Sequence, residues 1–271
     1  MAKITANDLA KKQKKISVAE FFEKNKHILG FGNPTRALVT SVKEAVDNAL
    51  DACEEANILP EIYVELKNGG EDEEITLIIE DNGPGIVKKQ IKHIFARLLY
   101  GSRFHDIRQS RGQQGIGISA VVLYSQLSTG RHTVVISKTS EELPANVVEL
   151  AINTNKNLGE VIKYDTTHWE KPHGTRVESK IIADYKRGRR FVYDYLQSTS
   201  IVNPHAKIIF KEPDGSEHVF ERTAEEIPPE AKSIKPHPHG AELGTLIKMA
   251  KYTKARKLTS FLKTDRKSTR L

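Results

Sequence analysis

One long amphipathic helix, predicted to begin at Pro34, constrains the fold of this chain more than any other segment. Asn33 can cap it by accepting hydrogen bonds from free backbone N–H groups, and proline suits the first helical position because the N–H that it lacks would be unpaired there. Apolar residues then recur at steps of three and four, at Leu38, Val42, Ala45, Val46, Ala49, Leu50 and Cys53. This spacing predicts that the helix buries one face in the core.

A polar stripe lies beside that apolar face and is formed by Glu44, Asn48 and Asp51. Residues three or four apart on a helix lie one above the other, so a carboxylate and an amide oxygen share one edge. Considered alone, the stripe is better explained by solvation than by a binding site, because a single motif is a weak indicator of function. The other motifs of the chain decide between the two interpretations.

Three further motifs follow in order along the chain. The turn D-N-G-P-G at 81–85 ends an apolar strand, the glycine-rich segment G-Q-Q-G-I-G occupies 112–117, and H-G-T occupies 173–175. Together with the acid and amide of the helix, this set resembles the ATP site shared by gyrase-type topoisomerases, heat-shock chaperones, histidine kinases and mismatch-repair ATPases. The flanking sequence narrows the resemblance to the B subunit of type IIB DNA topoisomerases (topoisomerase VI), through G-F-G-N-P-T-R-A-L at 30–38, Y-G-S-R-F-H at 100–105 and R-Q-S-R-G-Q-Q-G-I-G-I-S-A at 108–120.

The resemblance covers nearly the whole chain and implies a role for each site residue. It makes Glu44 the general base that orients water for attack on the γ-phosphate of ATP, and Asn48 a ligand of Mg²⁺. It makes Asp81 the residue that reads adenine, supported by the hydroxyl of Thr175. The other nucleotide-binding residues that it implies are Gly85, Ser102, Arg103, Gly112, Gln113, Gln114, Gly115, Ile116, Gly117, Ile118 and Ser119.

The chemistry of these residue types suits such a site. Aspartate is a pure hydrogen-bond acceptor and can accept from the exocyclic amine of adenine, which guanine lacks at that edge. Gly83 and Gly85 permit unusual backbone angles and leave room for a flat base, although an ordinary turn would explain the segment if it stood alone. The segment 100–115 is poor in aliphatic residues and rich in arginine and glycine, which is typical of a mobile lid over phosphates or of a solvated loop.

Several other functions can be weighed against this one. Gly115, Gly117 and Ala120 match the dinucleotide-binding pattern G-x-G-x-x-A, but the polar stretch I-R-Q-S-R-G-Q-Q stands where a buried strand is required, and the P-loop pattern does not occur. A histidine-kinase-like ATPase would need a phosphoacceptor histidine upstream, and only His27 precedes the site. The remaining alternative is a basic nucleic-acid-binding module with a non-hydrolysing ATP site.

We expect an α/β fold, a two-layer sandwich in which helices cover one face of a mixed, largely antiparallel sheet and a small helical module is appended. The resemblance identifies this as the Bergerat-type ATP-binding fold. Helical spacing predicts helices over 88–99, 116–124 and 185–197. Alternating or continuously apolar runs predict strands over 62–66, 75–79, 134–138, 147–152, 160–164 and 175–181. The strands after 134 are too closely spaced for helical crossovers, so we expect them to pair in an antiparallel sheet.

Three parts are expected along the chain. Residues 1–16 resemble a strap that crosses to a second copy of the chain when ATP binds, and the ATP-binding domain occupies 17–226. Residues 227–271 contain four prolines and then lysine-rich segments, which we interpret as a linker and the truncated start of a helix–two-turns–helix module. The resemblance further implies that the substrate is DNA and that an A subunit carrying the DNA-cleaving tyrosine completes an A2B2 heterotetramer.

Composition agrees with these expectations. The balance of 42 basic against 35 acidic residues, a net charge of +7, favours a polyanionic partner. Cys53 is the one cysteine and is predicted to be a buried, inert thiol. The N-terminus lacks an apolar signal core, and no run approaches the roughly 18 apolar residues of a membrane span, so we expect an intracellular protein with no membrane segment. The resemblance further implies that the protein is cytoplasmic and prokaryotic and associates with the nucleoid.

The chain length bears on turnover. In the family that the chain resembles, a lysine from a following transducer domain contacts the γ-phosphate, and 271 residues leave no room for that domain. We therefore expect this chain to bind ATP with Mg²⁺, to show little turnover and to cleave no DNA. Arg103 or Arg111 is the candidate to take the place of the lysine if turnover is substantial.

Overall fold

The computed structural model of the chain describes residues 16–70, 73–100, 111, 115–229 and 242–264, together with positions 5, 7, 9, 10 and 13. Most of the predicted strap and of the predicted linker lies outside the described residues, as do Ser102, Arg103, Gly112, Gln113 and Gln114. Within the part that is described, no helix combines the length and the apolar character needed to cross a bilayer.

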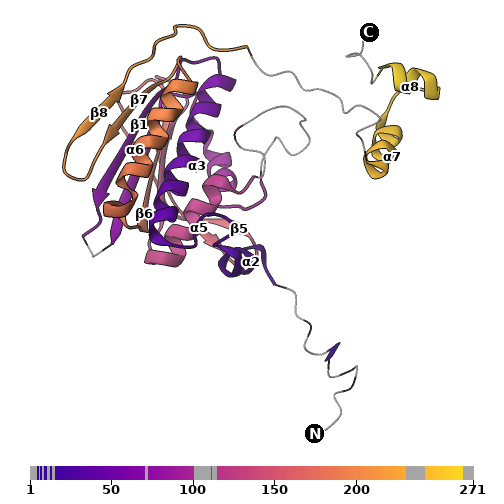
Figure 1. Cartoon of the computed structure of the whole chain (residues 1–271), viewed down its shortest axis with the longest axis horizontal. Helices are drawn as coiled ribbons and strands as arrows, with labels where there is room; N and C mark the ends of the chain where they lie inside the picture. Colours follow the sequence, from indigo (N-terminus) through magenta and orange to yellow (C-terminus); the bar gives the residue numbers. More distant parts are fainter. Residues whose placement is uncertain are drawn as a thin grey trace.

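The described residues form an eight-stranded sheet in the order β5-β4-β3-β6-β2-β1-β7-β8. Figure 1 shows β1, β7 and β8 at one edge of this sheet. Neighbouring strands are antiparallel except β1 and β7, which run parallel. The predicted mixed, largely antiparallel sheet is therefore confirmed. The strands are β1 Glu61–Asn68, β2 Glu74–Asp81, β3 Thr133–Lys138, β4 Ala145–Asn153, β5 Leu158–Thr167, β6 Gly174–Ile182, β7 Lys207–Lys211 and β8 Glu217–Phe220.

Helices cover one face of the sheet, as Figure 1 shows for α3, α5 and α6. The central member is α3, which packs against α5 and α6 and also against β1, β2 and β6. This arrangement confirms the two-layer α/β sandwich. The helices are α2 Val18–Asn25, α3 Pro34–Glu55, α4 Lys88–Phe95, α5 Gly117–Thr129, α6 Tyr185–Val202, α7 Leu243–Tyr252 and α8 Leu258–Thr264. The assignment of α7 and α8 to a helix–two-turns–helix module stays a prediction.

The long helix α3 forms as its sequence predicts. Asn33 Oδ1 accepts a hydrogen bond from the backbone N of Arg36 at 2.8 Å, and Pro34 occupies the first turn. All seven apolar residues predicted to face the core are buried. Six of them, all except Cys53, share one core with side chains of β1 and β2, namely Ile62, Val64, Leu66, Ile75, Leu77 and Ile79. Cys53 is fully buried, and burial raises the pKa of its thiol, which agrees with an inert role.

The helix predicted over 88–99 ends earlier, at Phe95. The side chain of Asn157 takes both backbone hydrogen bonds of Leu98. Its Oδ1 accepts from the N of Leu98 and its Nδ2 donates to the O of Leu98, each at 3.0 Å. Leu99 then adopts a left-handed φ of 59°. Asn157 lies in the turn between β4 and β5, so the local sequence of the helix carries no signal for this early end.

The core position of α3 can be tested with one substitution. Leu50 is 0% exposed, so Leu50→Ala should lower the free energy of unfolding by about 2–5 kcal/mol. Leu127→Ala is the control, since Leu127 lies on α5 with 43% of its surface exposed and should change stability by less than about 1 kcal/mol. Urea unfolding followed by circular dichroism measures both. Equal losses would contradict the assignment of this helix face to the core.

Candidate functional site

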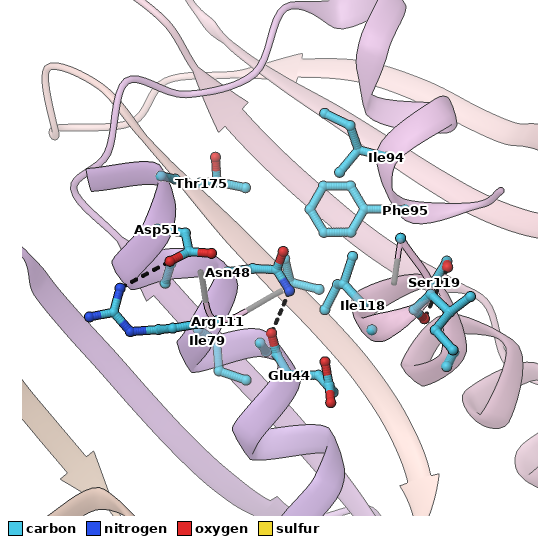
Figure 2. A pocket seen from close by; sticks show the side chains of 18 of the residues that line it. Glu44, Asn48, Asp51, Ile79, Ile94, Phe95, Arg111, Ile118, Ser119 and Thr175 are labelled. Carbon is cyan, nitrogen blue, oxygen red and sulfur yellow. Dashed lines mark hydrogen bonds and ion pairs between the residues drawn. The ribbon is translucent and has the colours of Figure 1, made fainter. Parts of the chain in front are cut away.

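The sequence motifs meet at an open cavity of about 1010 Å³ between the helices and the sheet (Figure 2). It is lined from α3, from the end of β2 and the turn after it, from the start of α5 and from the start of β6. Every predicted site residue that the structure describes lies on its wall. These are Glu44, Asn48, Asp81, Gly85, Gly115, Ile116, Gly117, Ile118, Ser119 and Thr175.

Glu44 and Asn48 lie on successive turns of α3 beside the cavity (Figure 2). The Nδ2 of Asn48 donates to the backbone O of Glu44 at 2.5 Å. The amide nitrogen is therefore used within the helix, and the amide oxygen Oδ1 is the atom of this side chain that suits a metal ion. Mg²⁺ accepts such an oxygen ligand and usually takes most of its other ligands from water and phosphate. Among the described residues, no group of three His, Cys, Asp or Glu is placed to hold a metal ion. The amide oxygen of Asn48 fits Mg²⁺ that takes its other ligands from water and from the phosphates of a nucleotide.

The electrostatic setting of Glu44 suits a general base. Burial raises the pKa of its carboxyl, the negative charge of Asp47 adds to the rise, and Lys43 opposes it. A carboxylate with a raised pKa accepts a proton from water more readily. Asp47 in turn accepts a hydrogen bond from Tyr195 Oη at 3.0 Å. This contact was not predicted, because Tyr195 belongs to α6 and its helical spacing indicates only a core position.

Asp81 ends β2 with 7% of its surface exposed, opposite Thr175 in the pairing of β2 with β6. Its Oδ1 accepts two backbone hydrogen bonds, from Gly83 N at 2.8 Å and from Thr175 N at 3.1 Å. Burial raises the pKa of Asp81 to about 6, against the lowering effect of these two bonds. Because both bonds end on Oδ1, the second carboxylate oxygen is the one that suits a donor on a ligand.

Thr175 supports Asp81 in a different way from the one expected. The bond to the aspartate comes from its backbone N–H, whereas its hydroxyl lies 3.1 Å from Ser137 Oγ. Ser137 also accepts from the backbone N of Ile86 at 2.8 Å, so it ties β3 to the residues after the turn. No sequence pattern points to this serine, which is a small polar residue at the end of an apolar strand.

The turn after Asp81 is also held from β1. Asn82 Oδ1 accepts from the backbone N of Glu61 at 2.8 Å, and Asn82 Nδ2 donates to the O of Leu59 at 3.0 Å. The side-chain amide thereby bridges two residues at the start of β1. The local sequence indicates only an ordinary turn residue at Asn82, because its partners lie more than twenty positions away.

Two glycines of the site are required by close approach. Gly85 has a φ of 71°, and a Cβ there would lie 2.0 Å from the backbone O of Lys138. Gly117 begins α5, and a Cβ there would lie 2.2 Å from Glu44 Oε2. The backbone at the start of α5 therefore lies directly against the catalytic candidate. Free N–H groups at a helix start suit a phosphate.

Arg111 is the one residue of 101–114 that the structure describes. Its guanidinium makes a bidentate pair with Glu54 at 2.7 and 2.8 Å, and it also contacts Asp51 Oδ1 at 2.9 Å (Figure 2) and Asn203 Oδ1 at 2.5 Å. Although burial disfavours the charge, Glu54 and Asp51 raise the pKa of Arg111. The side chain is engaged with the last turns of α3, which argues against the expectation that it replaces a lysine at the γ-phosphate.

Two relatives match this chain along most of its length. The B subunit of type 2 DNA topoisomerase 6 from Methanosarcina acetivorans is 58% identical over 259 residues, and that from Archaeoglobus fulgidus is 57% identical over 255 residues. The alignments cover 95% and 94% of this chain but 42% of each relative, so the chain spans about two fifths of the length of these curated relatives.

The fold is shared with a solved structure of low sequence identity. The ATPase region of Saccharomyces cerevisiae topoisomerase II matches with a TM-score of 0.50 and 14% identity, over 77% of this chain and 62% of that one. A family model described as "Histidine kinase-, DNA gyrase B-, and HSP90-like ATPase" matches residues 33–181, from the cap of α3 into β6. Because this match spans more than half of the residues of this chain, the chain belongs to the family of histidine kinase-, DNA gyrase B- and HSP90-like ATPases.

Proposed function

We propose that the chain is the ATP-binding part of the B subunit of a type IIB DNA topoisomerase, which passes one duplex through a transient double-strand break in another. The observation that carries the nucleotide assignment is the buried Asp81 carboxylate, fixed through Oδ1 by two backbone donors and sharing one cavity with Glu44 and Asn48. The names of the two relatives, each the B subunit of a type 2 DNA topoisomerase 6, support the assignment to DNA topology.

Each residue has a role in this proposal. Asp81 accepts a hydrogen bond from the exocyclic amine of adenine, which selects ATP against GTP. Asn48 holds Mg²⁺ through its amide oxygen, and the ion neutralises charge on the phosphates. Glu44 orients a water molecule and accepts its proton as the water attacks the γ-phosphorus and ADP leaves. Gly85 makes room for the base, and Thr175 holds Asp81. The segment from Gly112 to Ser119 wraps the phosphates through Gly112, Gln113, Gln114, Gly115, Ile116, Gly117, Ile118 and Ser119, and Ser102 and Arg103 also bind the nucleotide.

The partners follow from the same proposal. ATP binding brings two copies together through a strap at 1–16, the ATP-binding domain occupies 17–226, and residues 227–271 begin a helix–two-turns–helix module. DNA is the substrate, and the +7 net charge suits it. An A subunit supplies the tyrosine that cleaves DNA, and the complex acts in the cytoplasm on the nucleoid.

Calorimetric titration with a non-hydrolysable ATP analogue, with and without Mg²⁺, tests the nucleotide assignment. We expect binding that Mg²⁺ strengthens and that the matching GTP analogue reproduces only weakly. Equal affinity for the two analogues would contradict the role of Asp81, and a lack of any Mg²⁺ effect would contradict that of Asn48.

Glu44→Gln should keep nucleotide affinity within about threefold and abolish hydrolysis, because the amide preserves the shape of the side chain and removes the base. Phosphate release beside the analogue titration measures the two effects separately. Glu178→Gln makes the same chemical change on β6, where the side chain is 41% exposed, and should alter neither. Loss of binding in Glu44→Gln equal to its loss of turnover would argue for a binding role instead.

Asp81→Asn should weaken ATP binding and leave GTP binding unchanged. The asparagine Oδ1 can still accept from Gly83 and Thr175, which turns its NH₂ towards the amine of adenine and leaves two donors facing each other. An unpaired buried donor costs on the order of 1–3 kcal/mol, or roughly 5- to 150-fold in affinity. Titration of both analogues into the variant checks this, and an unchanged ratio of ATP to GTP affinity would refute it.

The same substitution should stabilise the empty protein. Because burial raises the pKa of Asp81 to about 6, the folded protein holds more protons than the unfolded chain between about pH 4 and pH 6. Ionisation of this carboxyl therefore lowers the free energy of unfolding as pH rises through that range. Above pH 6 the loss of stability that it causes no longer changes with pH. Asp81→Asn should be more stable than the native chain by on the order of 1–3 kcal/mol at pH 7.5, and by much less at pH 4. Urea unfolding at both pH values measures the difference in unfolding free energy between the variant and the native chain. A larger difference at pH 4 than at pH 7.5 would contradict the prediction.

A further inference from the structure

His173 makes a hydrogen bond that the nucleotide site does not explain. It lies in the turn before β6, and its Nδ1 is 2.7 Å from the backbone O of Gly83, ninety positions earlier in the chain. A carbonyl oxygen only accepts hydrogen bonds, so Nδ1 must carry the hydrogen. His173 is not among the described residues that line the cavity, so any effect on a ligand has to pass through another residue.

Gly83 is that residue, because it is held on both sides. Its carbonyl accepts from His173, and its N–H donates to Asp81 Oδ1 at 2.8 Å. Asp81 Oδ1 also accepts from Thr175 N at 3.1 Å. His173 and Thr175, on either side of Gly174, therefore both bond to the segment from Asp81 to Gly83. The position of Gly83 therefore decides whether the carboxylate has two donors on Oδ1 or one, and with it how the carboxylate is rotated.

The segment that carries His173 is itself anchored. Lys138 Nζ donates to the backbone O of Trp169 at 2.9 Å, and Lys171 Nζ pairs with Glu80 Oε1 at 2.5 Å. Gly174 follows with a φ of 144°, and a Cβ there would lie 2.3 Å from the backbone O of Asp81. These contacts fix the approach of the segment to the end of β2, so the imidazole is presented to the turn at a set distance.

We propose that His173 is a positioning residue for base selection: by holding the carbonyl of Gly83 it keeps Asp81 rotated so that the free carboxylate oxygen meets the amine of adenine. This inference rests on the proposed ATP-binding function. Without the bond, the Gly83 peptide is free to turn, Asp81 loses one of its two backbone donors, and the carboxylate is no longer aimed. Recognition of the base weakens, whereas the phosphate contacts stay as they were.

Three substitutions at position 173 in the full chain test the inference. In asparagine, the amide nitrogen is attached to Cγ, as Nδ1 is in histidine, so His173→Asn can restore the bond. In glutamine the same amide is one carbon further away, so His173→Gln is the matched control that keeps the donor and misplaces it. His173→Ala removes it. The readouts are affinities for non-hydrolysable ATP and GTP analogues with Mg²⁺, with thermal melting as the check on folding.

We expect His173→Ala and His173→Gln to bind the ATP analogue about tenfold more weakly, the size of one lost hydrogen bond, with GTP analogue affinity unchanged. His173→Asn should stay within about threefold of the native chain. Equal weakening of both analogues, equal weakening in all three variants, or no weakening in any of them overturns the inference. A native chain that binds both analogues equally, or neither, refutes the proposed function itself and is seen before any variant is made.

Discussion

The burial of one face of α3 on β1 and β2 is the interaction on which the rest of the site depends. The apolar residues of that face are packed into the core, so the helix is unable to rotate about its axis without exposing them. Glu44 and Asn48 lie on the adjacent stripe, and their directions are set by the same packing. The position of the catalytic candidate is thus a consequence of the hydrophobic core, and the nucleotide need not arrange it.

The second layer of organisation is polar and surrounds the end of β2. Asp81, Asn82 and Ser137 each bond to backbone groups of another segment, and together they join β1, β2, β3 and β6 around the end of β2. A carboxylate in such a place is unfavourable for folding, which its raised pKa expresses directly. The structure accepts this cost at a position where a ligand donor would remove it, as functional sites commonly do.

Local patterns predicted what depends on local spacing. The apolar period of α3, its cap at Asn33, the alternation of the strands and the glycines of the site all follow from chain geometry within a few residues, and the structure agrees with them. Helix ends and supporting contacts escaped prediction when the deciding partner was distant in sequence. Asn157 ends α4 early, and Tyr195 reaches Asp47 across 148 positions. Such long-range contacts leave no repeating pattern in the sequence, and the type of a single polar residue does not indicate which distant residue it will contact. A single sequence therefore does not reveal them.

The pairing of Asp81 with Thr175 carries a consequence for how the cavity forms as the protein folds. The two residues are neighbours in the β2–β6 ladder although 94 positions separate them, and side chains alternate between the faces of a strand. A slip of one residue would place Glu80 opposite Thr175 and point Asp81 to the other face of the sheet. Closing so long a loop is slow compared with forming a helix. A chain emerging from the ribosome therefore lacks the wall of the cavity that Asp81 and Thr175 form until β6 has been made and has paired with β2 in the correct register.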